Sequence, residues 1–319
     1  MNSSPVMPQD IEAYEEAERN AFLETHDRLD EASEPFPLIK FLAAVLGQLA
    51  LFLCLFAWLI PGIFHDELSH PLLIVVWTIA LGLPMSLFEY IYHRYLLHSS
   101  VLPFMASMHR AHSLHHGLTY VKAPVTPKDP EKLVQVKSEY PIEKSHQEEA
   151  MMFPLYTASI FYLLFLGLLA LPLKLLLPHQ PIVLPVMFGV TLLYGSYEMW
   201  HAVLHLSYER FWRPKLESPR IGRLTRYIYG FHLMHHWRPT SNDAVVGFWG
   251  VALWDHLFGT HHRPGRMPLK DASVAYKDAD LGKPRWPISM LDRHQGTMYK
   301  ASRSIERFLA RIFLRRQTS

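Results

Sequence analysis

Four long apolar stretches constrain the fold of this 319-residue chain more than any other feature of its sequence. A helix needs about 20 residues to cross the hydrocarbon core of a bilayer, and each stretch supplies that length. A single such stretch could equally be a buried helix of a soluble protein. Four of them, two nearly free of charge, instead predict a polytopic membrane protein. They occupy residues 37–64, 71–92, 151–177 and 181–200.

Charge and cysteine content exclude several classes of function. The 31 Lys and Arg residues nearly balance the 29 Asp and Glu residues, for a net charge of +2, so there is no basic footprint for nucleic acid. The single cysteine, Cys54, lies inside the first apolar stretch, which excludes internal disulfides, iron–sulfur clusters and Cys-based zinc sites. The acidic first residues do not have the pattern of a cleavable secretory signal.

Short links join the apolar stretches in pairs, which predicts two helical hairpins. The links "HDELSH" and "PHQ" contain no Lys or Arg, whereas nearly all other positive charge lies on the opposite side, with Lys174 as the exception. By the positive-inside rule, both termini and the segments after residues 92 and 200 are cytoplasmic. The predicted fold is therefore all-α, with four transmembrane helices in two hairpins and a cytoplasmic helical cap.

Three parts follow along the chain: an acidic cytoplasmic segment (1–36), a membrane domain (37–262) and a cytoplasmic C-terminal segment (263–319). The sequence of the last part predicts a basic amphipathic helix that lies on an anionic membrane leaflet. A helix packed on the domain is the alternative. Its apolar and basic stripes are Ile305, Phe308, Leu309 and Ile312, and Arg303, Arg307, Arg311 and Arg315. The proline-rich, charged segment 117–150 is interpreted as a lid or a docking surface.

Histidines recur in four spaced groups near the ends of the second and fourth stretches. "RAHSLHHG" (110–117) and "GFHLMHHW" (230–237) share a His-x-x-His-His pattern, and "WHAVLH" (200–205) contains an i,i+4 pair. Residues three and four apart share one face of an α-helix, so each group projects its rings together. The pair in "HRYLLH" (93–98) is five apart, which a straight α-helix does not align. That pair predicts a helix end or a change of direction.

So many buried imidazoles would be costly without a shared partner, and a metal site is the economical interpretation. Ten rings are too many for one ion, so we expect two metals with four or five ligands each and an open position. Imidazole suits zinc, copper, iron and nickel alike. The predicted ligands are His93, His98, His112, His115, His116, His201, His205, His232, His235 and His236.

Other residues receive weaker assignments. Glu89, Glu198 and Asp255 are predicted to orient the ligand rings as supporting carboxylates. His109 is interpreted as an eleventh ligand or a supporting residue. The histidines near the end of the membrane domain stay ambiguous: His256, His261 and His262. Isolated histidines are interpreted as ordinary polar residues: His26, His65, His70, His146, His179 and His294.

The four ordered motifs "HRYLLH", "HSLHH", "HAVLH" and "HLMHH" resemble those of the fatty acid hydroxylase/sterol desaturase superfamily. The closing segment "HLMHHW…VGFWGVALWDHLFGT" is similar to that family's last histidine box and the residues after it. The resemblance covers roughly residues 71–262. It implies that the ten histidines listed above hold a non-haem di-iron centre, in which zinc could replace iron after purification.

The resemblance further implies an O2-dependent enzyme that takes two electrons and hydroxylates a lipid C–H bond, with a fatty acyl chain favoured. Because no haem electron-carrier motif (His-Pro-Gly-Gly) is present, the electrons must come from a separate protein. Sphingolipid, sterol and carotenoid substrates stay open, as do desaturation and carbon-chain cleavage on the same scaffold. A metal transporter or a membrane haem carrier is the rival class, disfavoured because the histidines begin where the apolar stretches end.

Overall fold

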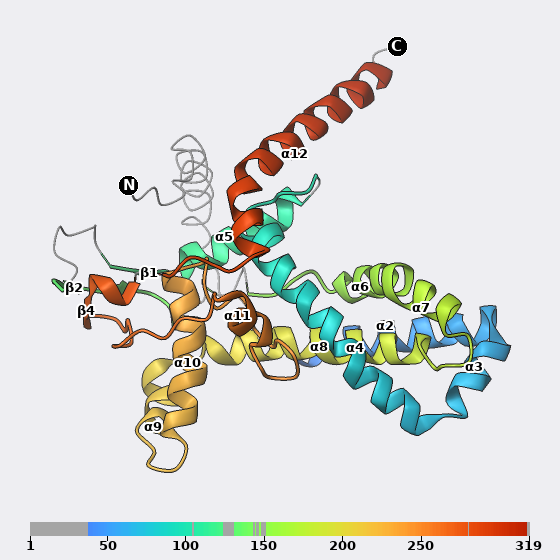
Figure 1. Cartoon of the computed structure of the whole chain (residues 1–319), viewed down its shortest axis with the longest axis horizontal. Coiled ribbons are helices and arrows are strands. Elements are labelled where there is room, and N and C mark those ends of the chain that lie inside the picture. The colour runs from blue at the N-terminus through green and yellow to red at the C-terminus, as the bar shows by residue number, and fades with distance from the viewer. Residues whose placement is uncertain are drawn as a thin grey trace.

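The computed structural model describes residues 38–103, 105–123, 131–142, 144, 147, 151–279 and 281–317. Within these ranges the chain is mostly helical, with a few short strands. The predicted acidic segment 1–36 lies outside the described residues, as do His26 and His146. The helices form an elongated lobe on the right of Figure 1 and a cap on the left.

Three helical runs in the lobe are long and apolar enough to cross a membrane. The first is α2 (Leu38–Leu59), and the second, Pro71–Leu97, joins α4 (Pro71–Ile91) to a π-helix (Tyr92–Leu97). The third, Thr157–Leu176, consists of α6 (Thr157–Phe165), a π-helix (Leu166–Ala170) and α7 (Leu171–Leu176). Three of the four predicted spans are therefore confirmed as candidate membrane helices.

The fourth predicted span, residues 181–200, is helical but is not apolar enough to stand with the other three. It forms α8 (Val183–Leu204), which packs against α2, α4 and α6. A helix enclosed by neighbours meets little lipid, so it can carry polar side chains such as Tyr194 and Glu198 on buried faces. The packing of α8 against three neighbouring helices explains why it contains more polar residues than the three candidate spans.

The links between the apolar helices are more structured than the sequence indicated. Pro61 starts a separate helix, α3 (Pro61–Leu68), which lies between α2 and α4. Within it, the buried carboxylate of Glu67 accepts hydrogen bonds from the backbone N–H groups of residues 182–184, at the start of α8. Lys174 completes this arrangement with an ion pair to Glu67 at 3.0 Å. The one basic residue at this end of the lobe is thus neutralised locally.

The π-helix after α4 resolves the unusual spacing of His93 and His98. A π-helix bonds residue i+5 back to residue i, and the backbone N–H of His98 donates to the carbonyl of His93 at 3.3 Å. The two rings consequently lie one above the other, with centroids 5.1 Å apart. The prediction that this pair needs a departure from straight α-helix is confirmed.

The cap consists of short helices and two small antiparallel sheets. Its helices are α5 (Ala106–Leu118), α9 (Arg213–Leu216), α10 (Gly222–Trp237) and α11 (Leu253–Phe258), with a π-helix at Tyr208–Trp212 and a 3-10 turn at Tyr276–Ala279. Strand β1 (Val121–Lys122) pairs with β3 (Lys137–Ser138), and β2 (Leu133–Gln135) pairs with β4 (Ser273–Ala275). The β2–β4 pairing ties the segment 131–142 to the C-terminal part of the chain.

The C-terminal helix α12 (Ile288–Gln317) begins against the body and then projects away from it (Figure 1). Asp292 and Arg303 bind residues that follow α4, namely Arg94 and Ser100. Beyond that contact, Phe308 is 63% exposed. The first turns of α12 are thus packed on the body, whereas Ile305 and Phe308 further along are exposed; binding of this helix to an anionic leaflet stays a prediction.

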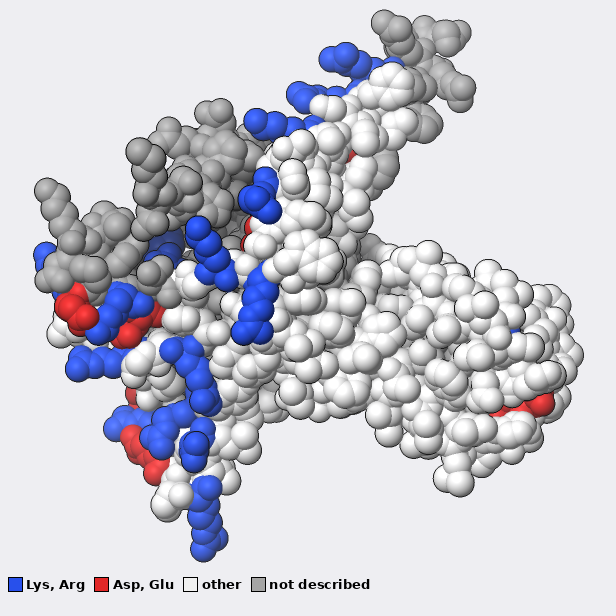
Figure 2. All heavy atoms as spheres, in the orientation of Figure 1, with Lys and Arg blue, Asp and Glu red and all other residues white. Residues whose placement is uncertain are grey.

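Charge is divided sharply between the two parts of the molecule. Figure 2 shows Lys and Arg over the cap and along α12, while the lobe is almost entirely uncharged apart from a small patch at its far end. Large apolar side chains cover the lobe surface, including Leu72 (81% exposed), Leu168 (73%) and Leu175 (75%). Such a surface is costly in water and suits a lipid environment.

A loop of the cap is fastened to the side of α4. The indole of Trp249 donates to the backbone carbonyl of Ile79 at 3.0 Å, and its ring lies directly over Gly82. A Cβ atom at Gly82 would stand 2.5 Å from the indole nitrogen. This close approach requires glycine at this position.

We therefore expect Gly82→Ala to destabilise the protein, although alanine favours helix. Overpacking costs about 1–3 kcal/mol, more than the roughly 1 kcal/mol that alanine gains in helix propensity. Thermal unfolding in detergent should show a lower Tm. Gly47→Ala in α2 is the matched control, because nothing lies within 4 Å of a Cβ there; it should leave the Tm unchanged or raise it. Equal Tm values for both variants would contradict the close packing of Trp249.

Candidate metal centre

The ten predicted histidines lie together in two groups of five at the junction of lobe and cap. In each group, one nitrogen from every ring lies within 4.8 Å of the others. We call them the His93 group and the His115 group. The first contains His93, His98, His112, His116 and His235. The second contains His115, His201, His205, His232 and His236.

The two His-x-x-His-His motifs are shared between the groups in opposite ways. In α5, the first and last histidines of the motif join the His93 group, and His115 crosses to the other group. In α10 the first and last join the His115 group, and His235 crosses over. The π-helical pair from α4 and the i,i+4 pair from α8 complete one group each. The groups adjoin, with the rings of His116 and His236 stacked at 4.1 Å.

Backbone carbonyls fix the orientation of four of the rings. A carbonyl oxygen can only accept a hydrogen bond, so the Nδ1 atom facing it must carry the proton and the Nε2 atom must carry a lone pair. This tautomer presents Nε2 to a metal, as ligating histidines do when their other nitrogen is held by an acceptor. The four pairs are His93 with Asp243, His205 with Tyr140, His235 with Ser241, and His236 with Thr119.

Spacings between ring nitrogens match those around a bound ion. The Nε2 atoms of His93 and His98 each lie 3.1 Å from Nε2 of His112, and those of His205 and His232 are 3.2 Å apart. Ligand nitrogens about 2.1 Å from one ion are separated by about 3.0 Å in octahedral and about 3.4 Å in tetrahedral geometry. Both groups are positioned to bind a metal ion.

Several ring nitrogens have no hydrogen-bond partner although they are fully buried. Both nitrogens of His115 and His116 are in this position, together with Nε2 of His201 and His236. A buried polar atom without a partner costs about 1–3 kcal/mol, so a cluster of them is unfavourable unless a ligand satisfies it. An ion in each group would bind one lone pair of each ring, and the donor set therefore fits metal.

Burial also keeps the rings neutral. It lowers the pKa of His112, His115 and His116 well below the usual value, and repulsion between neighbouring imidazolium charges adds to the effect. Burial likewise lowers the pKa of His205 to about 4. Neutral imidazole is the metal-binding form, so at pH 7 no proton must leave these rings before an ion binds.

The predicted carboxylates act on the backbone that surrounds the rings. Glu89 accepts from the N–H groups of residues 245–247. Asp255 accepts from the N–H groups of Asp243 and Ala244 at 2.8 and 3.0 Å. Because the Asp243 carbonyl holds His93, Asp255 positions a ring through one intervening peptide. No hydrogen bond joins these carboxylates to a histidine ring in the described part of the chain.

The remaining assignments separate clearly. Glu198 accepts from the backbone N–H of Phe153, not from a ring. His109 lies outside both groups, and its Nδ1 donates to the carbonyl of Leu97 at 2.7 Å. His256 and His261 stack on each other at 4.0 Å, away from the ligand sets.

An ion-pair network that was not predicted from the sequence lies next to the His93 group. Arg94 binds Asp243 at 2.9 Å and Asp292 of α12 at 2.7 Å, and Asp243 is fully buried. A charged residue at the end of an apolar span is expensive unless paired, so the position of Arg94 in the sequence could have predicted an acidic partner. The carbonyls that hold the rings could not be predicted in this way, because every residue has a backbone carbonyl.

The chain matches no known family model, no curated protein and no solved structure. The resemblance of its four motifs to a known superfamily therefore rests on those motifs alone, and the chemistry of the site rests on its own geometry.

We expect the purified protein to hold two metal ions per chain, and His116→Ala or His235→Ala to remove at least one. Elemental analysis measures this directly. Asp255→Ala should weaken metal binding by about 10–100-fold, the usual effect of losing a supporting partner. Glu198→Ala should likewise reduce metal binding less than the loss of a ligand does. His70→Ala and His179→Ala, outside both groups, are the controls and should leave metal content unchanged. Two ions retained in both ligand variants would refute the dinuclear centre.

Proposed function

We propose that this protein is a membrane-embedded di-iron oxygenase that hydroxylates a C–H bond of a lipid, with a fatty acyl chain as the favoured substrate. The observation that carries the proposal is an apolar cavity in the lobe that adjoins both histidine groups. A metal pair beside an apolar cavity suits oxidation of a hydrocarbon chain. A transporter or a haem carrier would place its histidines along the interior of the spans.

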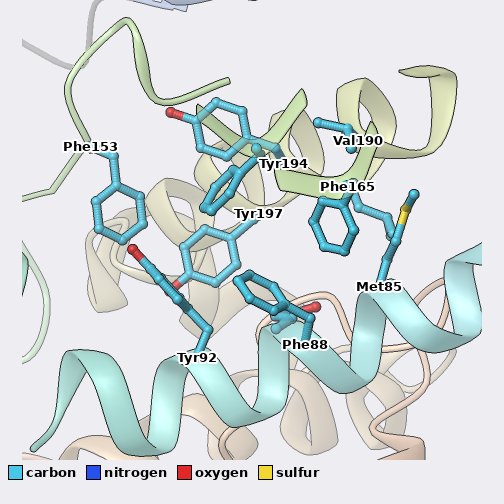
Figure 3. A pocket seen from close by; sticks show the side chains of 11 residues that line it. Met85, Phe88, Tyr92, Phe153, Phe165, Val190, Tyr194 and Tyr197 are labelled. Atoms are coloured by element: carbon cyan, nitrogen blue, oxygen red, sulfur yellow. The ribbon is translucent and has the colours of Figure 1, made fainter. Parts of the chain in front are cut away.

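The cavity lies between α4, α6 and α8, and about 520 Å³ of space, part of it outside the protein surface, is not filled by protein atoms there. Aromatic and aliphatic side chains surround it (Figure 3). Tyr92 and Tyr197 line the end next to the histidines, while Met85 and Val190 each lie seven residues further along their helices. Seven residues span about 10 Å of helix. The cavity therefore extends from the histidines into the membrane part of the lobe, as an acyl chain would require.

Tyr197 connects the cavity to both groups. Its ring centroid lies 6.4 Å from that of His93 and 5.8 Å from that of His201. Glu89 also borders the cavity, but its carboxylate is occupied by three backbone N–H groups. The cavity walls therefore leave few polar groups free to bind water. An apolar chain in the cavity would lie with one end at Tyr197, next to both histidine groups.

Two iron ions in the histidine groups would supply the oxidising chemistry: R–H, O2, two electrons and two protons give R–OH and water. The chain's own part is to hold the rings, exclude water and orient the hydrocarbon. The electrons must come from a separate donor protein. We propose that this donor approaches from the cytoplasmic side, where the cap carries most Lys and Arg residues (Figure 2).

Lipid mass spectrometry of cells with and without the gene tests the reaction. We expect a lipid heavier by one oxygen that depends on the gene and disappears with His116→Ala. A product lighter by two hydrogens would replace hydroxylation by desaturation, and a pair of shortened products would indicate chain cleavage. If no lipid changes while both metals are bound, the oxygenase proposal fails.

A cavity variant separates substrate binding from metal binding. Val190→Phe adds bulk at the end of the cavity remote from the histidines, so longer acyl chains should be excluded and turnover should fall at least about tenfold, whereas metal content stays the same. Leu192→Phe is the matched control, because Leu192 lies on the same helix with 51% of its side chain exposed; it should leave turnover unchanged. Equal turnover in both variants would contradict the role of the cavity.

The proposed topology places residues 93–150 and 201–319, with both termini, on the cytoplasmic side and the α3 end of the lobe on the other. Single cysteines replacing the exposed residues Asp66 and Lys137 test it in a Cys54→Ala background. An impermeant thiol reagent applied to sealed vesicles should label the two from opposite sides. Labelling of both from one side would rule out the hairpin arrangement.

A further inference from the structure

Helix α10 has a second functional face, opposite its histidines. Arg223, Arg226 and Tyr227 recur at helical spacing along one side of it. His232 follows Arg223 by nine residues, which is two and a half turns of an α-helix, so its side chain leaves the opposite side. One face of α10 thus supplies the metal ligands, and the other borders two adjoining surface hollows.

The segment after α11 forms the other wall of these hollows. They share Arg223, Tyr227 and Arg263, and have about 830 and 840 Å³ of space open to solvent. The guanidinium of Arg263 lies 4.6 Å from the centre of the Tyr227 ring. Tyr227 in turn stacks on His261, with ring centroids 5.9 Å apart. The walls therefore alternate cationic and aromatic groups. We call this feature the arginine pocket.

Positive charge in the arginine pocket is uncompensated. Its four arginines form no ion pair with an acidic residue in the described part of the chain: Arg220, Arg223, Arg226 and Arg263. The neighbouring Arg213 of α9, by contrast, pairs with Glu209 at 2.8 Å and with Glu217 at 3.0 Å. The one carboxylate placed beside the pocket wall among the described residues, that of Asp278 next to Gly265, forms no ion pair with any of the four arginines. Four like charges held together favour an external anion.

His261 gives an independent indication of a ligand. Its Nε2 atom is buried and has no hydrogen-bond partner. Burial, together with the neighbouring His256 and Arg263, lowers the pKa of His261 to about 4. The ring sits in a locally positive environment and has one nitrogen unsatisfied. A hydrogen-bonding anion in the pocket would relieve both conditions.

The chemistry and shape of the pocket select a phosphate group. Guanidinium groups form paired hydrogen bonds to phosphate oxygens, and arginine is favoured wherever that fork geometry matters. A concave site suits a small anionic group, whereas protein partners dock on broader and flatter surfaces. Leu224, which lines one of the hollows, is 59% exposed, and Ile221, the residue after the pocket's Arg220, is 45% exposed. These apolar residues would contact acyl chains attached to such a group.

We propose that the arginine pocket binds a phosphate group, presented either by the headgroup of an anionic phospholipid or by a free phosphate ester. The site lies on the face of α10 that points away from the metal centre, about one helix diameter (10–12 Å) from the histidines. Its occupancy would stabilise α10 and thereby the three ligands that this helix carries. Binding to it does not depend on the oxygenase chemistry.

Calorimetric titration of the purified, metal-loaded protein in detergent tests the proposal. The probes are inorganic phosphate, a short-chain phosphatidic acid, and the matching short-chain diacylglycerol, which lacks the phosphate. We expect saturable binding of one phosphate-bearing probe per chain and none of diacylglycerol. Tighter binding of phosphatidic acid than of inorganic phosphate identifies the lipid as the source; equal affinities identify a free phosphate ester.

Variants locate the site. Arg223→Gln with Arg226→Gln should weaken binding about ten- to hundredfold, because charged hydrogen bonds are lost, and His261→Phe should weaken it as well. Arg210→Gln removes the same charge from an exposed position outside the pocket and should change the affinity less than about twofold. Metal content and Tm in the absence of phosphate should be the same in all variants, which shows that each has folded.

Three results would overturn the proposal. The first is the absence of saturable binding for either phosphate probe. The second is an equal loss of affinity in Arg210→Gln and in the pocket variants, because that would indicate general charge attraction. The third is binding of an acidic electron-donor protein that needs Arg223 and Arg226 while neither phosphate probe binds, because the surface would then be a protein interface. None of these results bears on whether the metal centre oxidises lipids.

Discussion

The structure depends on keeping ten neutral imidazole rings close together with their lone pairs directed inward. Backbone carbonyls achieve this for four rings, since a carbonyl forces the proton onto Nδ1 and leaves Nε2 free. One of these carbonyls, that of Asp243, is itself fixed by a buried carboxylate, because Asp255 accepts from the N–H groups of residues 243 and 244. A carboxylate that touches no histidine thus helps to orient a ligand ring through the backbone.

The crossing of His115 and His235 between the groups explains why the same motif occurs twice. Each His-x-x-His-His helix gives two rings to one group and one to the other, in opposite senses. Neither α5 nor α10 can therefore move without disturbing both groups. The stacked rings of His116 and His236 lie where the two helices meet. The result is one rigid unit with two compartments, and not two independent sites that happen to be neighbours.

Much of this was readable from the sequence, for definable reasons. Helical spacing brought His112, His115 and His116 to one side of a helix, and the five-residue spacing of His93 and His98 required a departure from α-helix, which is a π-helix. The fourth predicted span, α8, forms a helix but is not among those apolar enough to count as a candidate span, and its packing against α2, α4 and α6 could not be known from a count of apolar residues. Hydrogen bonds that ring N–H groups donate to backbone carbonyls, such as the one from His205 to Tyr140, leave no trace in residue identities. Long-range ion pairs such as Arg94 with Asp292 needed the fold itself.

Glu67 has a consequence for how the protein assembles in the membrane. Its carboxylate is completely buried, and its partners are Lys174 and the first N–H groups of α8, all from the second half of the chain. When α2, α3 and α4 emerge from the ribosome, this acid has none of them. An unpaired acid is expensive in or near a bilayer, so the packing of α2, α3 and α4 should stay incomplete until Lys174 and the start of α8 have been synthesised. The two halves then become committed to each other at the end of the lobe farthest from the metals.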